Sequence, residues 1–119
     1  MSPKELVLKC VDLFNQGDAD QIALLFHEDA VNHRMPNTAI EGRKAIWDMF
    51  QQEFAQFDMT CIVENLFEDG AWAILEWKGP NDDMRGCGFF HIVNNKIKTQ
   101  CGYWDKLTFL KEQGLSISE

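Results

Sequence analysis

A long β-hairpin is the sequence feature that most constrains the fold. Residues 84–93 and 96–105 are two runs rich in β-branched and aromatic side chains, and they flank Asn94 and Asn95. Asparagine tolerates the positive φ angles of a two-residue hairpin turn, so this turn fixes the register of the two strands. A hairpin of this length is not stable alone in water. We therefore expect it to belong to a larger sheet with at least one face covered by helices.

The part of the chain that precedes the sheet is predicted to form three helices. Apolar residues recur at helical spacing from Pro3, and Gly17 ends this first helix. Asp18 caps a second helix, and a third begins at Gly42. The apolar faces of the second and third helices consist of Ile22, Leu25 and Phe26, and of Ile46, Met49, Phe50, Phe54 and Phe57. Between these helices, residues 30–34 are predicted to be a short extended segment and residues 35–38 a loop.

The second half of the chain is predicted to be a four-stranded meander. Strands are expected over residues 59–67 and 71–78, followed by a polar turn over 79–83 and then by the hairpin. A closing turn of helix is expected over 106–114, with Leu107 and Leu110 facing inward. This order predicts an α+β fold, in which a cone-shaped, curved antiparallel sheet carries three helices on its concave face. With 119 residues, the chain fits a single domain over 1–119.

The strand over residues 71–78 is apolar on both faces. Trp72 and Ile74 point to the side opposite Ala73, Leu75 and Trp77, because side chains alternate along a strand. One face is expected to meet the helices. Since monomers seldom leave a wide apolar sheet face in water, we expect the outer face to pair with a second copy as a homodimer.

Charge and cysteine content exclude several classes of partner. A net charge of −8 disfavours nucleic acid and anionic membranes, which bind clustered Lys and Arg. The chain has no apolar segment long enough to span a membrane and no signal-peptide pattern at Met1, so we expect a cytoplasmic protein.

The cysteines are Cys10, Cys61, Cys87 and Cys101. They are widely spaced and lack zinc-like spacing, so free thiols, no metal and no cofactor are expected.

Four short motifs resemble a known family. They are Asn15 to Asp18, Phe26 to Val31, Glu41 to Ile46, and Asn95 to Ile97 leading to Tyr103, Trp104 and Asp105. In this order and spacing they resemble the SnoaL-like branch of the nuclear transport factor 2-like superfamily, and the resemblance covers nearly the whole chain. It implies the cone fold described above, usually as a dimer. The superfamily includes isomerases, polyketide cyclases, epoxide hydrolases, dehydratases and binding proteins, so function must be argued from the site.

The acid–base sets of two enzyme types in this superfamily are missing from the chain. Ketosteroid isomerases use an Asp base with a Tyr and a protonated Asp. The resemblance places Cys10 at the Tyr, Arg34 at the base and Gly102 near the strand acid. Limonene-type epoxide hydrolases carry an Arg-x-Asp pair and a further Asp, where this chain has Trp77-Lys78-Gly79 and Gly102.

Four residues are candidates for catalysis, each with a structural alternative. Arg34 can bind a carboxylate or enolate oxygen at the cavity mouth, or it can be a solvent-exposed loop residue. His33 and His91 can act as general acid or base near neutral pH, or can be structural or interface residues. Asp105 is the remaining strand carboxylate for proton transfer, or the cap of a final helical turn.

Six apolar residues are candidates for lining a small-molecule cavity, with ordinary core packing as the alternative. They are Met49, Phe50, Leu75, Trp77, Phe90 and Trp104. Gly88 and Gly102 remove side-chain volume beside these aromatic residues, which leaves space for a pocket or bends the sheet.

Two functions therefore stay open at the level of the sequence. In the first, the chain binds a small apolar, carbonyl-containing molecule and carries out cofactor-independent acid–base chemistry of the cyclase or isomerase type. In the second, it is a non-catalytic ligand-binding or dimeric interaction module of the same fold, as the missing acids suggest.

Overall fold

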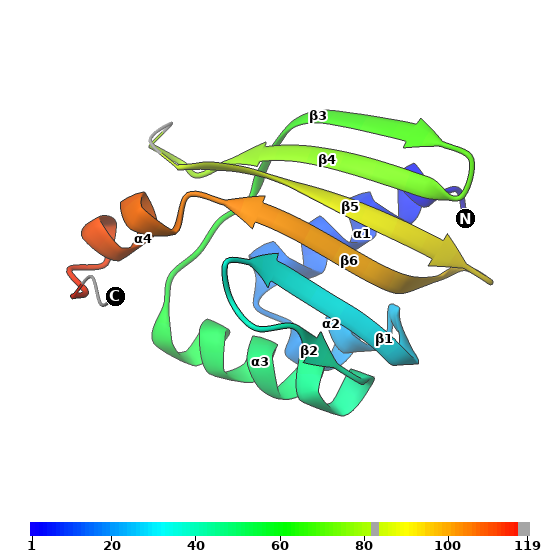
Figure 1. The fold of residues 1–119 in the computed structure, drawn as a ribbon, viewed down its shortest axis with the longest axis horizontal. Coiled ribbons are helices and arrows are strands. Elements are labelled where there is room, and N and C mark those ends of the chain that lie inside the picture. Colours follow the sequence, from blue (N-terminus) through cyan, green and yellow to red (C-terminus); the bar gives the residue numbers. More distant parts are fainter. Residues whose placement is uncertain (82–83, 117–119) are drawn as a thin grey trace.

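The computed structural model describes residues 1–81 and 84–116 and shows a curved, open six-stranded sheet with helices packed against one side (Figure 1). The strand order is β2-β1-β6-β5-β4-β3. This confirms the predicted α+β class and the curved sheet. The sheet is mixed, however, because β1 runs parallel to β6, whereas an entirely antiparallel sheet was expected. The described part of the chain has four helices: three in the region predicted to cover the sheet, and a fourth near the end of the chain, where a closing turn of helix was expected over 106–114.

Helix α1 (Pro3–Gln16) is capped by Ser2, and helix α2 (Ala19–Ala23) begins at the predicted cap, Asp18. Ser2 Oγ accepts a hydrogen bond from the backbone N–H of Glu5 at 3.2 Å, and the Glu5 carboxylate accepts one from the N–H of Ser2 at 3.0 Å. This reciprocal pair satisfies two amide groups that a helix start leaves without partners. Gly17 ends α1 with a φ of 69°, and Asp18 caps α2.

Strand β1 (Phe26–Met35) starts earlier than predicted. Phe26 was placed on the second helix, and that prediction was wrong, because Phe26 pairs with Ile97 of β6. The backbone N–H of Ile97 also donates to Leu25 O at 2.8 Å, so the chain leaves α2 to join the sheet. The two-residue strand β2 (Ile40–Glu41), which pairs antiparallel with β1, lies between the loop predicted over 35–38 and the third helix, where no element was predicted.

Helix α3 (Arg43–Gln56) follows Gly42 and lies beside β1 and β2, at that edge of the sheet (Figure 1). Arg43 donates from Nε and Nη2 to the carbonyl oxygen of Phe26 at 2.9 and 2.6 Å, which fixes the start of α3 against β1. Ile46 and Phe50 are the fully buried residues of its inner face.

Strands β3 (Ile62–Asp69), β4 (Trp72–Lys78), β5 (Arg85–Val93) and β6 (Lys96–Trp104) form the predicted antiparallel meander. Asn94 and Asn95 have φ angles of 50° and 63°, which confirms the hairpin turn. Strand β3 begins at Ile62 rather than Met59, because the side chain of Asn15 holds the backbone of Cys61 through hydrogen bonds of 2.7 and 2.9 Å. The polar turn expected over 79–83 lies partly outside the described residues.

Helix α4 (Lys106–Glu112) closes one end of the molecule. The ring of Phe109 is buried, with its centroid 5.2 Å from that of Trp104 and 5.1 Å from that of Phe57. Leu107 was expected to face inward, but it is exposed, because Phe109 occupies the inner face of this short helix. Among the described residues, no helix is both long and apolar enough to cross a membrane.

Candidate functional site

A cavity of about 320 Å³ lies between the concave face of the sheet and the helices. Residues of α1, α2, α3, α4 and of strands β1, β4, β5 and β6 line it, together with the loop after β1 and the segment that precedes β3. Most of these side chains are apolar. The cavity therefore has the size and character of a site for a small organic molecule, at the lower end of the usual range of about 300 to 1,000 Å³.

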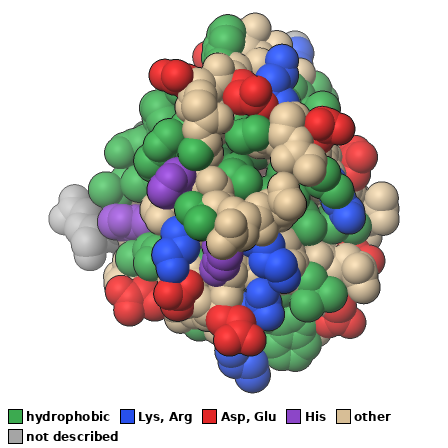
Figure 2. Space-filling view, turned by 90° about the vertical axis from the view of Figure 1, so that its right-hand side faces the viewer, with side chains coloured by type: hydrophobic (Ala, Val, Ile, Leu, Met, Phe, Trp, Pro, Cys, Tyr) green, Lys and Arg blue, Asp and Glu red, His purple; other side chains and the backbone are tan. Residues whose placement is uncertain are grey.

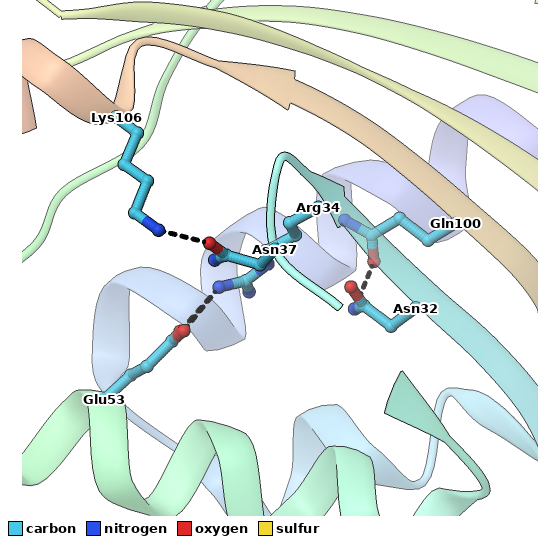
Figure 3. Close-up of polar contacts among 6 residues, drawn as sticks. All are labelled: Asn32, Arg34, Asn37, Glu53, Gln100 and Lys106. Carbon is cyan, nitrogen blue, oxygen red and sulfur yellow. Dashed lines mark hydrogen bonds and ion pairs between the residues drawn. The ribbon is translucent and has the colours of Figure 1, made fainter. Parts of the chain in front are cut away.

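Three of the described residues that line the cavity carry a formal charge. They are Arg34 on β1, Glu53 on α3 and Lys106 at the start of α4. Figure 3 shows these side chains converging from three separate elements, with Asn37 between Lys106 and Arg34. The charged groups are thus concentrated at one end of a mostly apolar space.

Arg34 lies at the centre of this polar end. Its Nη1 donates to both carboxylate oxygens of Glu53 at 2.7 Å, and its guanidinium lies 5.3 Å from the ring centroid of Phe50. A cation over an aromatic face is attracted by the ring quadrupole, which holds the guanidinium in place. In the part of the chain that the structure describes, Nε and Nη2 of Arg34 have no hydrogen-bond partner. They remain available as donors to a bound molecule.

Lys106 is held by a neutral group. Its Nζ donates to Asn37 Oδ1 at 2.7 Å, and the backbone N–H of Asn37 donates to Arg34 O at 2.7 Å. The loop after β1 thereby connects the start of α4 to Arg34.

A second polar contact lies deeper in the sheet. Asn32, which is fully buried on β1, donates from Nδ2 to Gln100 Oε1 at 3.0 Å, and Gln100 lines the cavity. Asn32 Oδ1 and Trp104 Nε1 are buried and have no partner among the described residues. Such groups reduce the stability of the fold, since they lose their bonds to water without replacement.

Two thiols in the cavity wall are held in the protonated form. Burial raises the pKa of both Cys10 and Cys61 to about 12. A thiol with such a pKa is almost entirely protonated at neutral pH, so neither cysteine is an activated nucleophile. All four cysteines are free.

The structure brings most of the candidate cavity residues to this site. Arg34, Phe50, Leu75, Trp77, Phe90 and Trp104 line it. Met49 is half-buried and packs against the core without lining the cavity. Cys10, Arg34 and Gly102, the positions at which the resemblance placed the isomerase residues, all line the cavity as well. Glu53 is the one carboxylate in the described lining.

The other three candidate catalytic residues lie elsewhere. His33 and His91 are on the outer face of the sheet, because the residues beside them, Arg34 and Phe90, face the cavity. The ring of His91 stacks on that of Trp72, with centroids 4.6 Å apart. Asp105 caps α4 by accepting hydrogen bonds from the backbone N–H and the hydroxyl of Thr108, which also lower the pKa of Asp105.

Sequence reasoning missed Glu53 and Lys106. Glu53 lies within the apolar face of α3, three residues after Phe50 and four after Met49, and a charged residue at that spacing is a signal that could have identified it. Lys106 has no comparable signal, because its position depends on how α4 folds back over the end of the sheet. No cluster of three or more metal-binding side chains occurs among residues 1–81 and 84–116.

The outer face of the sheet carries a broad row of apolar side chains. Phe67, Ile74, Phe89 and Cys101 are register neighbours across β3 to β6, and Trp72 and Tyr103 flank them. Phe67 is 58% exposed and Tyr103 is 47% exposed. Figure 2 views one end of the molecule, where histidine side chains lie next to hydrophobic and basic side chains.

The sequence profile of the SnoaL-like domain matches residues 7–100. The chain belongs to the SnoaL-like family. The matched range includes every element from α1 to most of β6, and therefore most of the cavity wall. No curated protein sequence matches this SnoaL-like chain significantly.

Solved structures show the same fold at low sequence identity. A protein from Catenulispora acidiphila with a ketosteroid isomerase-like fold, in complex with trimethylamine, aligns with a TM-score of 0.82 and 14% identity over 98% of this chain and 96% of its own. An NTF2-like protein of unknown function from Cytophaga hutchinsonii aligns with a TM-score of 0.79 and 17% identity, covering 92% and 96%. The epoxide hydrolase/cyclase-like enzyme SalBIII, which acts in pyran ring formation in the polyether salinomycin, aligns with a TM-score of 0.76 and 22% identity, covering 88% and 92%. The SnoaL-like chain is thus related in fold to cyclases and isomerases.

Proposed function

We propose that this SnoaL-like protein binds a small apolar molecule bearing a carbonyl oxygen in the cavity between the sheet and the helices. The observation that carries the proposal is the distribution of polarity, because apolar walls surround one charged end formed by Arg34, Glu53 and Lys106. Small-molecule sites commonly combine apolar walls with a few polar groups that orient the ligand. The free Nε and Nη2 donors of Arg34 fit an oxygen acceptor at this end.

Acid–base chemistry on that molecule is a second candidate function. In this reaction Glu53 takes a proton from a carbon next to the carbonyl group, and Arg34 stabilises the enolate oxygen that results. The support is that both side chains line the cavity. The relation to cyclases and isomerases supports this chemistry, which needs no metal or cofactor. The ion pair opposes it, because both carboxylate oxygens of Glu53 already accept hydrogen bonds from Arg34 Nη1. The same pairing favours non-catalytic binding.

The test of binding uses 2-acetylnaphthalene, a neutral ketone with a two-ring apolar body. A ligand that binds the native protein raises its melting temperature. We expect a concentration-dependent rise and a saturable heat of binding in calorimetry. If neither this ketone nor other apolar carbonyl compounds changes the melting temperature, the proposal fails.

The test of catalysis follows hydrogen–deuterium exchange of the methyl protons of the same ketone by NMR. If Glu53 is the base, the protein accelerates exchange and Glu53→Gln returns it to the rate in buffer. Asp48→Asn, an exposed carboxylate on the same helix, is the matched control and keeps the acceleration. Exchange at the buffer rate with the wild-type protein, despite binding, would leave the non-catalytic function.

We also propose that the outer face of the sheet pairs with a second copy of the chain. The support is the row of apolar side chains that includes Phe67, Trp72 and Tyr103, each at least 40% exposed. Monomeric proteins seldom leave a patch of this kind in water. The cytoplasmic location expected from the sequence remains part of this proposal.

A further inference from the structure

We propose that the ligand is an anion, namely a small apolar carboxylate whose head group is bound jointly by Arg34 and Lys106. This inference rests on the proposed function, because it assigns the ligand class of the same cavity. It goes further by choosing a charged oxygen acceptor over a neutral carbonyl group.

The balance of charge in the cavity supports an anionic ligand. The lining contains two cations and one anion, whereas the whole chain contains 11 Lys and Arg against 19 Asp and Glu. The net charge of the cavity lining is therefore positive, whereas that of the whole chain is negative. A half-buried cation without a counter-ion is costly, since burial weakens its solvation.

Lys106 is the cation without a counter-ion. Its described hydrogen bond is to the neutral amide oxygen of Asn37, and no carboxylate in the described part of the chain lies within ion-pair distance of its Nζ. An ammonium group has three donors, so two remain after this bond. These donors and the local positive charge suit a negatively charged acceptor.

Arg34 supplies a second set of donors next to Lys106. Its pairing with Glu53 uses Nη1 alone and leaves the Nε and Nη2 edge free. That edge has the fork geometry that binds both oxygens of a carboxylate. Asn37, which is bonded to Lys106 through its side chain and to Arg34 through its backbone, keeps the two cations at the same end of the cavity (Figure 3).

The rest of the cavity sets the size of the ligand. Phe50, Leu75 and Phe90 are nearly fully buried and form apolar walls. A volume of about 320 Å³ suits a one-ring or two-ring hydrophobic body. The expected class is therefore an aromatic or alicyclic carboxylate.

The experiment compares two probes of nearly equal size and shape. 2-Naphthoate carries a carboxylate where 2-acetylnaphthalene carries a neutral ketone, and calorimetry at pH 7 gives both affinities. Because hydrogen bonds to charged groups are about twice as strong as neutral ones, we expect naphthoate to bind at least about tenfold more tightly. Raising the salt concentration should weaken naphthoate binding and leave ketone binding unchanged.

Variants assign the effect to Lys106. Lys106→Met keeps most of the apolar stem and should lower naphthoate affinity by about three- to tenfold, a larger loss than for the ketone. Lys111→Met, an exposed lysine on the same helix, is the control and should change neither. The salt titration needs no variant, so the inference stays testable if Lys106→Met folds poorly.

Each outcome decides between the two proposals. If the ketone binds as tightly as naphthoate, or if Lys106→Met weakens both equally, the anion inference is overturned and the proposed function stands. If neither probe binds, the proposed function itself fails. Tighter, salt-sensitive binding of naphthoate that depends on Lys106 supports both.

Discussion

A double-mutant cycle on Arg34 and Glu53 tests whether their ion pair organises the polar end of the cavity. Arg34→Met removes the charge and keeps most of the side-chain length, and Glu53→Gln removes the opposite charge. The cycle compares the free energy of unfolding of both single variants, the double variant and the wild-type protein.

The expected coupling follows from burial. The side chains of Arg34 and Glu53 are 22% and 24% exposed, and Nη1 lies 2.7 Å from the carboxylate. Exposed pairs contribute about 0.2 to 1 kcal/mol, whereas breaking a fully buried pair costs about 3 to 5 kcal/mol. We therefore expect an intermediate coupling of roughly 1 to 3 kcal/mol. Arg34→Met also loses its contact with Phe50, but this loss occurs in both backgrounds and cancels from the coupling.

The assay is urea unfolding followed by far-ultraviolet circular dichroism. Lys44 and Asp48 form a matched control pair on the same helix, with side chains 80% and 48% exposed and an i,i+4 spacing. Their coupling should be about 0.3 to 0.5 kcal/mol. If the coupling of Arg34 and Glu53 is no larger than that of the control pair, the ion pair does not order the site and the reasoning is refuted.

The remaining predictions concern the core, the thiols and the outer face. Phe50→Ala should lower the free energy of unfolding by about 3 to 5 kcal/mol in urea titrations. Leu8→Ala, on the exposed side of α1, is the control and should change it by less than about 0.5 kcal/mol. Similar losses in the two variants would mean that Phe50 is not central to the core. The pKa of Cys10 and Cys61 rises from 9.0 to about 12 on folding, so alkylation of these two thiols at pH 8 should be about a thousandfold slower in the folded protein than in the unfolded chain. Mass spectrometry of the peptides that contain Cys10 and Cys61 measures both rates, and faster labelling of the folded protein would contradict the prediction. The same shifts add stability that is complete below pH 9 and is lost as the pH rises toward about 12, so alkaline titration of the melting temperature should show a decline that Cys10→Ala makes shallower. Phe67→Asp should convert a dimer into a monomer in size-exclusion chromatography with light scattering, and a monomeric wild-type protein at micromolar concentration would rule out the dimer.

The hairpin could be predicted because its signals are local. The positive φ angles of Asn94 and Asn95 follow from residue type, and the two runs beside them alternate as strands do. The start of β1 could not be predicted in this way. Phe26 continues the helical spacing of Ile22 and Leu25, and only its parallel pairing with Ile97, far away in the sequence, shows that it belongs to the sheet.

The candidate site could be predicted in part, and strand alternation explains the residues that were misplaced. His91 follows Phe90 and His33 precedes Arg34, so neither histidine can face the same cavity as its neighbour. Applied to these pairs, that rule would have assigned both histidines to the outer face. Glu53 was visible as a charge within an apolar helical face, whereas Lys106 depends on tertiary placement.

The most direct test of the account is whether the cavity is the ligand site. Gly102 lies on the cavity floor, where an added Cβ would meet Arg34 Cγ at 3.8 Å, an ordinary contact, so Gly102→Leu should fold while its side chain extends into the cavity. Calorimetry with 2-acetylnaphthalene and 2-naphthoate should show binding to the wild-type protein and at least about a tenfold loss of affinity for Gly102→Leu. Equal affinity of the two proteins, with the variant natively folded, would contradict the account.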